Sequence, residues 1–241
     1  MIGEGAAMRL HLPIFLAMLA IAAPAAAETR NFGINSFEKI RVDGPFRVTL
    51  TTGVAPYAKA IGSAQAIDKV AVDVQGSTLV VHNNVSSWGA DSGANSGPVE
   101  IQVGTHDLSS AWLNGSGSLA INKVKGLRFD LSIQGSALGE VGSVAVDQLT
   151  ISVSGSGSLR LAGDAGKVTS TLRGNSTLDA AKLKVKDAVI TADGPGTVDA
   201  TITNSVKVSA FGPATIRIGG NPGCTLQTSG SASVSGCKST Q

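Results

Sequence analysis

Seven glycines recur at nearly constant intervals through the C-terminal half of the chain. They are separated by 20, 20, 19, 20, 18 and 18 residues, and each opens a similar phrase, such as GSGSLAI, GSGSLRL or GPATIRI. The seven positions are Gly115, Gly135, Gly155, Gly174, Gly194, Gly212 and Gly230. A repeat of this length cannot bury an apolar face alone, so neighbouring repeats must stack and share one core.

The residues after each glycine alternate in a way that predicts strands. Side chains of a strand point to opposite faces in turn, so positions four and six, which are apolar or small, face inward. Position four holds Leu119, Gly139, Leu159, Leu178, Val198, Ile216 and Val234, and position six holds Ile121, Val141, Leu161, Ala180, Ala200, Ile218 and Gly236. Alternation before each glycine, as in Phe129, Leu131 and Ile133, makes the glycine a corner between two strands, where close backbone approach excludes a Cβ.

The whole pattern predicts an all-β protein, a parallel β-helix with rungs of about 20 residues. We expect one domain over residues 28–241, with irregular rungs over 33–108 and regular rungs over 109–237. In the irregular part, residues 40–50, 70–81 and 99–103 fit the rung template, and Gly76 takes the place of a corner glycine. A third side is indicated by Val144, Val146, Leu183, Val185 and Ile202. The alternative architecture is an antiparallel sandwich or barrel, which would show hairpin turns.

Residues 1–27 have the pattern of a cleavable signal peptide, and either Met1 or Met8 is the start. Arg9 precedes an apolar run from Leu12 to Ala23, and an A-x-A site stands before Glu28. The alternative is a membrane anchor, but the run is shorter than the roughly 20 residues that a spanning helix needs. We therefore expect a periplasmic or extracellular protein without a stable membrane span in its mature chain.

The only two cysteines, Cys224 and Cys237, lie near the C-terminus. In an oxidising compartment a disulfide is the favoured interpretation, and two unpaired buried thiols are the alternative. A disulfide here would close the last rung in place of its third side.

The composition offers little support for catalysis or for binding to nucleic acid. The net charge of +2 indicates no strong attraction to nucleic acid. Of the three histidines, His11 lies in the signal sequence, and His82 and His106 are isolated from each other. We expect neither a metal site nor a cofactor, since no cluster of ligating residues occurs.

The best candidate site is the outward column between the two apolar ones. Stacking would align five charged residues: Glu140, Arg160, Asp179, Asp199 and Arg217. Asp179 and Asp199 would lie about 5 Å apart, a spacing found for the paired carboxylates of retaining glycosidases. The plainer interpretation is a solvated ladder of compensating charges, in which each contact contributes at most about 1 kcal/mol.

A hydroxyl-rich column and two tryptophans complete the candidates for ligand contact. The column, three residues after each glycine, reads Ser118, Leu138, Ser158, Thr177, Thr197, Thr215 and Ser233. Trp88, in the segment SSWGADSGANSGP, and Trp112 are predicted to be outward, where an indole can stack on a sugar or anchor a partner. The alternative is that each tryptophan covers a neighbouring loop.

The phrases FEKIRVDGPFRVTLTTG, VAVDVQGSTLVVHNN, LNGSGSLAI and ISVSGSGSLRLAG make the chain similar to a known family. It resembles the family of auto-transporter adhesin head domains, the head GIN domain, over about residues 32–235. The resemblance implies a right-handed parallel β-helix in an exported bacterial protein and implies no established activity.

Together these features predict an exported, non-catalytic β-solenoid of the binding or adhesion type. Its expected partner is a glycan or a cell-envelope component, and the sequence gives no oligomeric state. The alternative is a polysaccharide-active β-helix enzyme that uses the Asp179 and Asp199 face.

Overall fold

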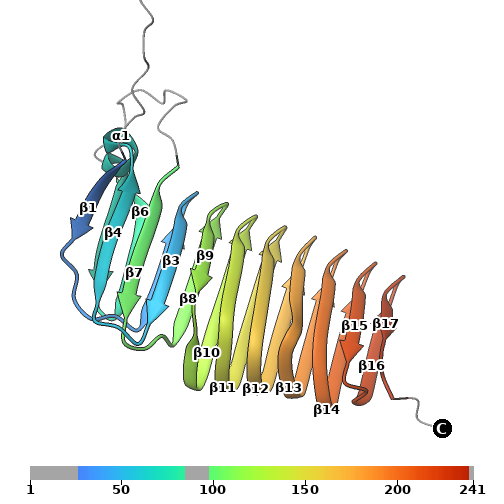
Figure 1. Cartoon of the computed structure of the whole chain (residues 1–241). Helices are drawn as coiled ribbons and strands as arrows, with labels where there is room; N and C mark the ends of the chain where they lie inside the picture. The colour runs from blue at the N-terminus through green and yellow to red at the C-terminus, as the bar shows by residue number, and fades with distance from the viewer. Residues whose placement is uncertain (1–26, 85–97, 239–241) are drawn as a thin grey trace, which may run out of the picture.

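The computed structural model describes residues 27–84 and 98–238. The predicted signal peptide, apart from Ala27, and the segment with Trp88 lie outside these described residues. In the described ranges, one short helix and seventeen strands form an elongated column, with the N-terminal elements at one end and the C-terminal rung at the other (Figure 1).

The elements are as follows in chain order: β1 (Glu28–Phe32), β2 (Lys39–Asp43), β3 (Arg47–Thr52), β4 (Tyr57–Gly62), α1 (Ala64–Asp68), β5 (Val70–Gln75), β6 (Thr78–Asn83), β7 (Glu100–Thr105), β8 (Ser110–Gly115), β9 (Ser118–Ile121), β10 (Val124–Gly135), β11 (Leu138–Gly155), β12 (Ser158–Arg173), β13 (Thr177–Asp193), β14 (Thr197–Phe211), β15 (Thr215–Gly219), β16 (Gly223–Ser229) and β17 (Ser233–Ser235).

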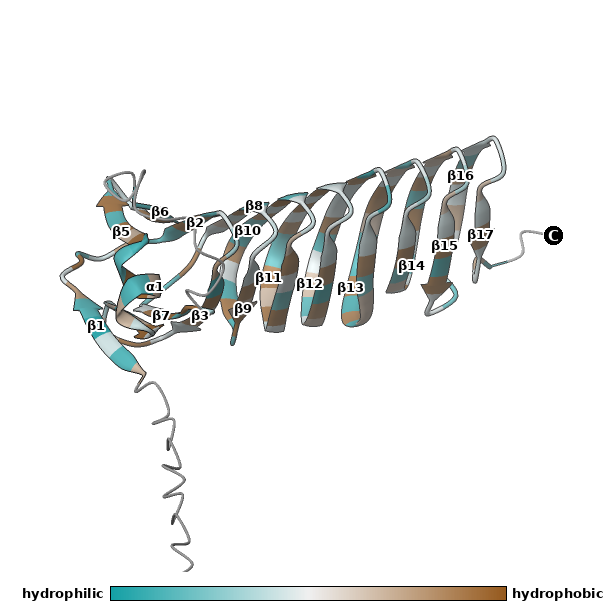
Figure 2. Ribbon diagram, turned by 90° about the horizontal axis from the view of Figure 1, so that it is seen from above, coloured by the Kyte–Doolittle hydropathy of each residue, from teal (hydrophilic) through white to brown (hydrophobic). Residues whose placement is uncertain are grey.

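The regular rungs stack in parallel and in register, which confirms the predicted β-solenoid. Leu159 pairs with Leu178, and Leu178 pairs with Val198. All three are at most 2% exposed, so they share one interior. Along the column, apolar and polar residues alternate within each strand (Figure 2). The antiparallel sandwich or barrel is therefore wrong for this part of the chain.

Each corner glycine divides a rung into two walls. The first wall holds the strand segments before each glycine: β8, the later parts of β10–β14, and β16. The second wall holds the segments after each glycine: β9, the early parts of β11–β14, β15 and β17. All seven glycines have positive φ angles, and each stacks on the glycine of the preceding rung. The third side is also as predicted, since Val144, Val146, Leu183, Val185 and Ile202 are buried.

The N-terminal rungs do not follow the order of the sequence, which the repeat did not predict. β2 lies between β6 and β8, and β3 lies between β7 and β9, so the rung of residues 39–52 is inserted between two later ones. Gly44 consequently stacks against Gly115 at the start of the glycine column. Thr52 holds this insertion through its hydroxyl, which donates to the Lys123 carbonyl at 2.7 Å.

Residues 70–81 were predicted to form a rung, and that prediction is wrong. β5 and β6 pair antiparallel, with Gln75 opposite Thr78, so Gly76 and Ser77 form a two-residue hairpin turn instead of a corner. Glycine with positive φ is typical of such turns. β4 also runs antiparallel between β1 and β7, and together with α1 these strands cover the N-terminal end.

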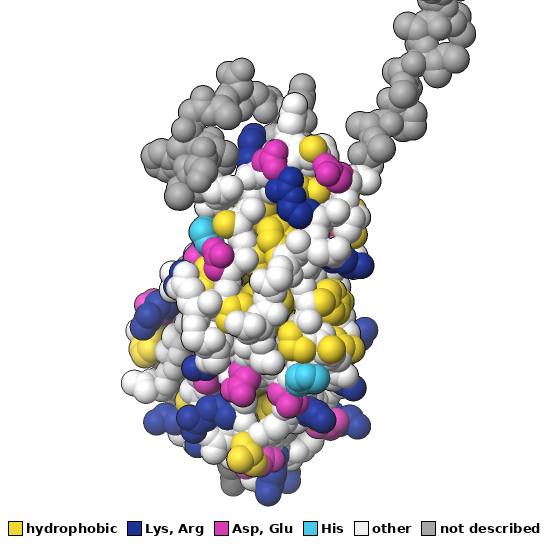
Figure 3. All heavy atoms as spheres, turned by 90° about the vertical axis from the view of Figure 1, so that its left-hand side faces the viewer, with side chains coloured by type: hydrophobic (Ala, Val, Ile, Leu, Met, Phe, Trp, Pro, Cys, Tyr) yellow, Lys and Arg dark blue, Asp and Glu magenta, His cyan; other side chains and the backbone are white. Residues whose placement is uncertain are grey.

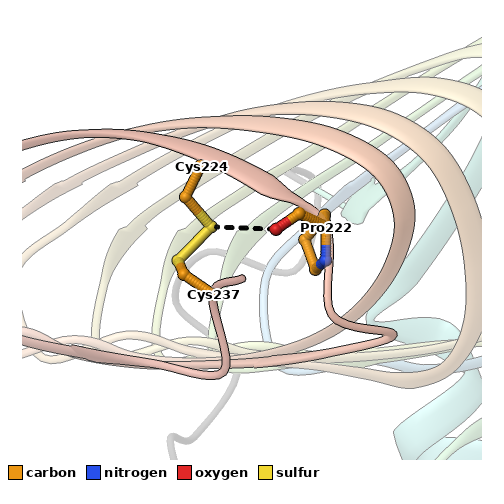
Figure 4. The surroundings of a disulfide bond; sticks show 3 residues. All are labelled: Pro222, Cys224 and Cys237. Atoms are coloured by element: carbon orange, nitrogen blue, oxygen red, sulfur yellow. Dashed lines mark hydrogen bonds between the residues drawn. A yellow bond between two sulfur atoms is a disulfide. The ribbon is translucent and has the colours of Figure 1, made fainter. Parts of the chain in front are cut away.

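The predicted disulfide joins Cys224 of β16 to Cys237, which follows β17. It crosses the inside of the last rung from one wall to the other (Figure 4). The Sγ atom of Cys224 lies 3.8 Å from the Pro222 carbonyl oxygen, and the Lys238 N–H donates to the same carbonyl at 3.0 Å. The bond therefore closes a rung that has no third strand within the described residues.

A fully buried inward position of the first wall holds a polar residue, Ser170. Ser170 stands between Ile151 and Ile190 in the stack, is 1% exposed, and its hydroxyl has no hydrogen-bond partner in the described part of the chain. A buried hydroxyl without a partner costs roughly 1–3 kcal/mol.

We expect Ser170→Ala to raise the free energy of unfolding by about 1 kcal/mol, because alanine removes the unpaired hydroxyl and leaves almost no cavity. Chemical denaturation monitored by circular dichroism measures the change. Thr169→Ala, at the exposed neighbouring position, is the control and should not stabilise. A loss of stability in Ser170→Ala would mean that the hydroxyl has a partner.

Candidate binding face

The five predicted charged residues lie in one outward column on the second wall. Glu140 pairs in register with Arg160, Arg160 with Asp179, Asp179 with Asp199, and Asp199 with Arg217. They project outward because their neighbours on either side, such as Leu159 and Leu161, are inward and fully buried. The register of the glycine stack thus brings together residues that are 18 to 20 positions apart in the chain.

Within this column the two aspartates are held by two arginines. Arg160 donates from Nε to Asp179 Oδ2 at 3.2 Å. Arg217 donates from Nε and Nη2 to the two carboxylate oxygens of Asp199, at 2.5 and 2.8 Å. These hydrogen bonds and the attraction of the Asp199 charge raise the pKa of Arg217. Glu140 makes no ion pair within residues 27–84 and 98–238.

A groove of about 540 Å³ runs along the second wall between the charged column and the hydroxyl-rich column. Its lining combines hydroxyls, charges and apolar side chains, and includes Arg47, Thr49, Ser118, Ala120, Leu138, Glu140, Ser158, Arg160, Thr177, Asp179 and Asp199. Leu138 is 58% exposed, and its neighbours in the same column are two serines, Ser118 and Ser158. Such a lining suits a polyhydroxylated ligand, with hydrogen bonds at its edges and apolar contact on one face.

The same geometry bears on the enzyme alternative. A retaining glycosidase needs one carboxylic acid that keeps its proton and one free carboxylate as nucleophile. In this column one oxygen of Asp179 accepts a hydrogen bond from Arg160, and both oxygens of Asp199 accept hydrogen bonds from Arg217. Both carboxylates are therefore engaged in ion pairs within the column.

Trp112 does not belong to this groove. It lies in β8 on the first wall, partly exposed, between Arg41 and Ser132 in register. Its wall lies on the other side of the glycine corner from Arg160, so Trp112 and Arg160 face different sides of the solenoid. Trp88 lies outside the described residues.

The sequence pattern missed Arg47 and Thr49, which extend the groove toward the N-terminal end. β3 pairs with β9, so Arg47 stands beside Ser118 and Thr49 beside Ala120. These residues are 71 positions from their partners, and no spacing in the repeat relates them. The alternation of residues 47–50 marks them as outward but does not say which rung they join.

The other chemically notable side chains stand apart. His82 lies 3.1 Å from Asp73 and 2.9 Å from the Asn83 carbonyl oxygen, at the hairpin of β5 and β6. Among the described residues, no group of three His, Cys, Asp or Glu side chains is arranged to hold a metal ion. No helix in the described ranges is long and apolar enough to cross a membrane.

The stacked rungs, the covered N-terminal end and the long polar outer wall define the class of the protein, a β-solenoid. Residues 36–222 match the family described as putative auto-transporter adhesin, head GIN domain, and the chain belongs to that family. No curated protein shows a significant sequence match.

Solved structures share the fold at low sequence identity. A putative adhesin from Bacteroides fragilis superposes with a TM-score of 0.77 at 20% identity, over 88% of this chain and 97% of its own. A putative lipid binding protein from Parabacteroides distasonis gives 0.66 at 21% identity, over 86% and 95%. A putative adhesin from Parabacteroides merdae gives 0.66 at 17% identity, also over 86% and 95%.

Proposed function

We propose that this protein is an exported, non-catalytic binding module of the adhesion type that holds a glycan or another cell-envelope component. Export rests on the signal pattern of residues 1–27, and adhesion is the role that the family description names. The observation that carries the proposal is the groove on the second wall, where hydroxyls, paired charges and exposed Leu138 line one continuous surface.

Several physical features favour binding at this face. The ion pairs of Arg160 and Arg217 hold the side chains of this column in place, so a ligand that contacts them causes little further loss of side-chain entropy. The rung spacing of about 4.8 Å repeats the same kinds of donor and acceptor along the wall, as an extended polymer requires. A rigid solenoid therefore offers a long ligand many weak contacts that add.

The proposed face can be tested with two arginines of the same strand. Arg160 and Arg173 both belong to β12 and are both exposed, but they lie on opposite walls. We expect Arg160→Ala to weaken binding to immobilised polysaccharides or whole bacterial cells about tenfold, since a charged hydrogen bond contributes about 1.5–3 kcal/mol. Arg173→Ala should leave binding unchanged within twofold.

Two further variants, Leu138→Ser and Trp88→Ala, are tested in the same binding assay. Leu138→Ser should weaken binding if the leucine contacts the ligand, and Trp88→Ala examines the predicted contact outside the described residues. Thermal melting of every variant checks that the fold is intact. Equal binding by the parent, Arg160→Ala and Leu138→Ser would contradict the assignment of the groove.

The second candidate function, polysaccharide cleavage, is favoured by one observation, the adjacent positions of Asp179 and Asp199. Incubation with a panel of polysaccharides, scored for new reducing ends, separates the two functions. We expect no release above the buffer control. Release that disappears in Asp199→Asn would replace the binding proposal with an enzyme.

A further inference from the structure

The C-terminal rung, formed by β16 and β17, differs from all others in what lies next to it. We infer that this rung is a self-association edge, through which two copies of the chain join end to end. The inference concerns the end of the column and is independent of the groove and of the ligand proposed for it.

The first observation is an open edge. β16 pairs only with β14, and β17 pairs only with β15, among the described residues. A strand inside the stack, such as β12, has a neighbour on both sides. As far as residues 27–84 and 98–238 show, the outer side of the last rung therefore presents backbone N–H and C=O groups with no strand partner, which are a template for another strand.

The second observation is the absence of charge. Residues 219–237 contain no Asp, Glu, Lys or Arg. Native proteins commonly protect an edge strand with charges, especially lysine, because charge disfavours pairing. Neither β16 nor β17 carries such a charge, and Lys238 follows only after Cys237.

The opposite end of the column provides the contrast. There the outermost strands carry charges: β1 contains Glu28 and Arg30, and Arg30 pairs with Asp68 of α1 at 2.7 Å. β5, the other outermost strand, contains Asp73. Figure 3, which views this end, shows acidic and basic side chains spread over it. One end is thus protected, and the other is not.

The third observation is apolar surface at the open end. Leu226 continues the inward column of Val208, and Val234 continues that of Ile216. Val208 and Ile216 are fully buried, whereas Leu226 is 46% exposed and Val234 is partly exposed. Within the described part of the chain, the interior of the solenoid is therefore only partly covered at this end, where the disulfide crosses it.

A second copy of the same rung fits this edge. The rung is a flattened loop with two walls. A two-fold axis perpendicular to the column and to the walls places each wall of one copy against the same wall of the other, with the facing strands antiparallel. The contact is isologous, and two uncharged edges meet without repulsion. It continues the backbone pairing and aliphatic stacking that already hold neighbouring rungs together. The disulfide keeps the edge ordered before association, which lowers the entropy cost.

The test uses the mature, oxidised chain in analytical ultracentrifugation over a wide range of protein concentration. We expect a reversible monomer–dimer equilibrium that Leu226→Lys weakens at least tenfold, because two like charges would face each other across the axis. Leu127→Lys makes the same change at a leucine that is 78% exposed in β10, far from the edge, and should leave the equilibrium unchanged.

Hydrogen exchange of the parent protein provides a readout that needs no variant. Amides of β16 and β17 should gain protection as the protein concentration rises, whereas those of β1 should not. A chain that stays monomeric at all concentrations, as it would if the edge served a strand from another protein, overturns the inference. So does a dimer that is equally weakened by Leu127→Lys or whose protection maps to β1 and β5.

Discussion

Replacing Gly155 by alanine is expected to lower the free energy of unfolding by about 2–5 kcal/mol, from positive-φ strain together with overpacking. Gly155 has a φ of +104°, and a Cβ at this position would lie 2.7 Å from the carbonyl oxygen of Gly135 in the preceding rung. That oxygen belongs to the backbone and accepts a hydrogen bond from Ser156, so it cannot move away cheaply. The clash therefore separates two stacked rungs in the middle of the column.

Two further glycines separate the causes of this effect. Gly126 has a φ of +141° but open space around the added Cβ, so Gly126→Ala measures the backbone strain alone. Gly33 has neither a positive φ nor an atom within 4 Å, and Gly33→Ala should be nearly neutral. Equilibrium denaturation should rank the losses as Gly155, Gly126 and Gly33. If Gly155→Ala were as stable as Gly33→Ala, the close stacking of the corners would be wrong.

Removing the disulfide with the double substitution Cys224→Ser and Cys237→Ser should lower stability by about 3 kcal/mol. The two cysteines are 13 residues apart, and a cross-linked loop of that size restricts the unfolded chain by roughly this amount. The loss should also be local, because the terminal rung of a solenoid has a neighbour on one side only. Leu226 and Val234, which are already partly exposed, would no longer be held over the interior.

The expected pattern is earlier melting together with faster hydrogen exchange in β16 and β17 than in β12. Adding a reductant to the parent protein is the matched control and should reproduce the shift of the double variant. Reductant should have no effect on the double variant itself. Melting temperatures that agree for parent, reduced parent and double variant would show that the bond does not stabilise the last rung.

The candidate site was predictable to the extent that it depends on the repeat. Glu140, Arg160, Asp179, Asp199 and Arg217 were predicted to align, and they do, because the glycine corners fix the register of each rung on the next. The order of the column also gives each aspartate one arginine neighbour, Arg160 for Asp179 and Arg217 for Asp199. Spacing alone does not say that Arg160 pairs with Asp179 and not with Glu140, since this depends on side-chain rotamers.

The sequence by itself determined the stacked rungs, their inward columns and the positions of the corners. These features follow from local rules: side chains alternate with a period of two, and a corner with positive φ requires glycine. The two isolated cysteines likewise predicted the bond that closes the last rung.

Only the tertiary structure decided the order of the N-terminal rungs and the antiparallel cover of that end. The rung of β2 and β3 lies between strands that come later in the chain, and β5 turns back on β6 although its residues also fit a rung. The alternation of apolar and polar residues shows which face of a strand is buried, but it does not show which strand pairs with it. That choice depends on contacts between residues some 70 positions apart, such as Arg47 and Ser118, and no local pattern encodes them.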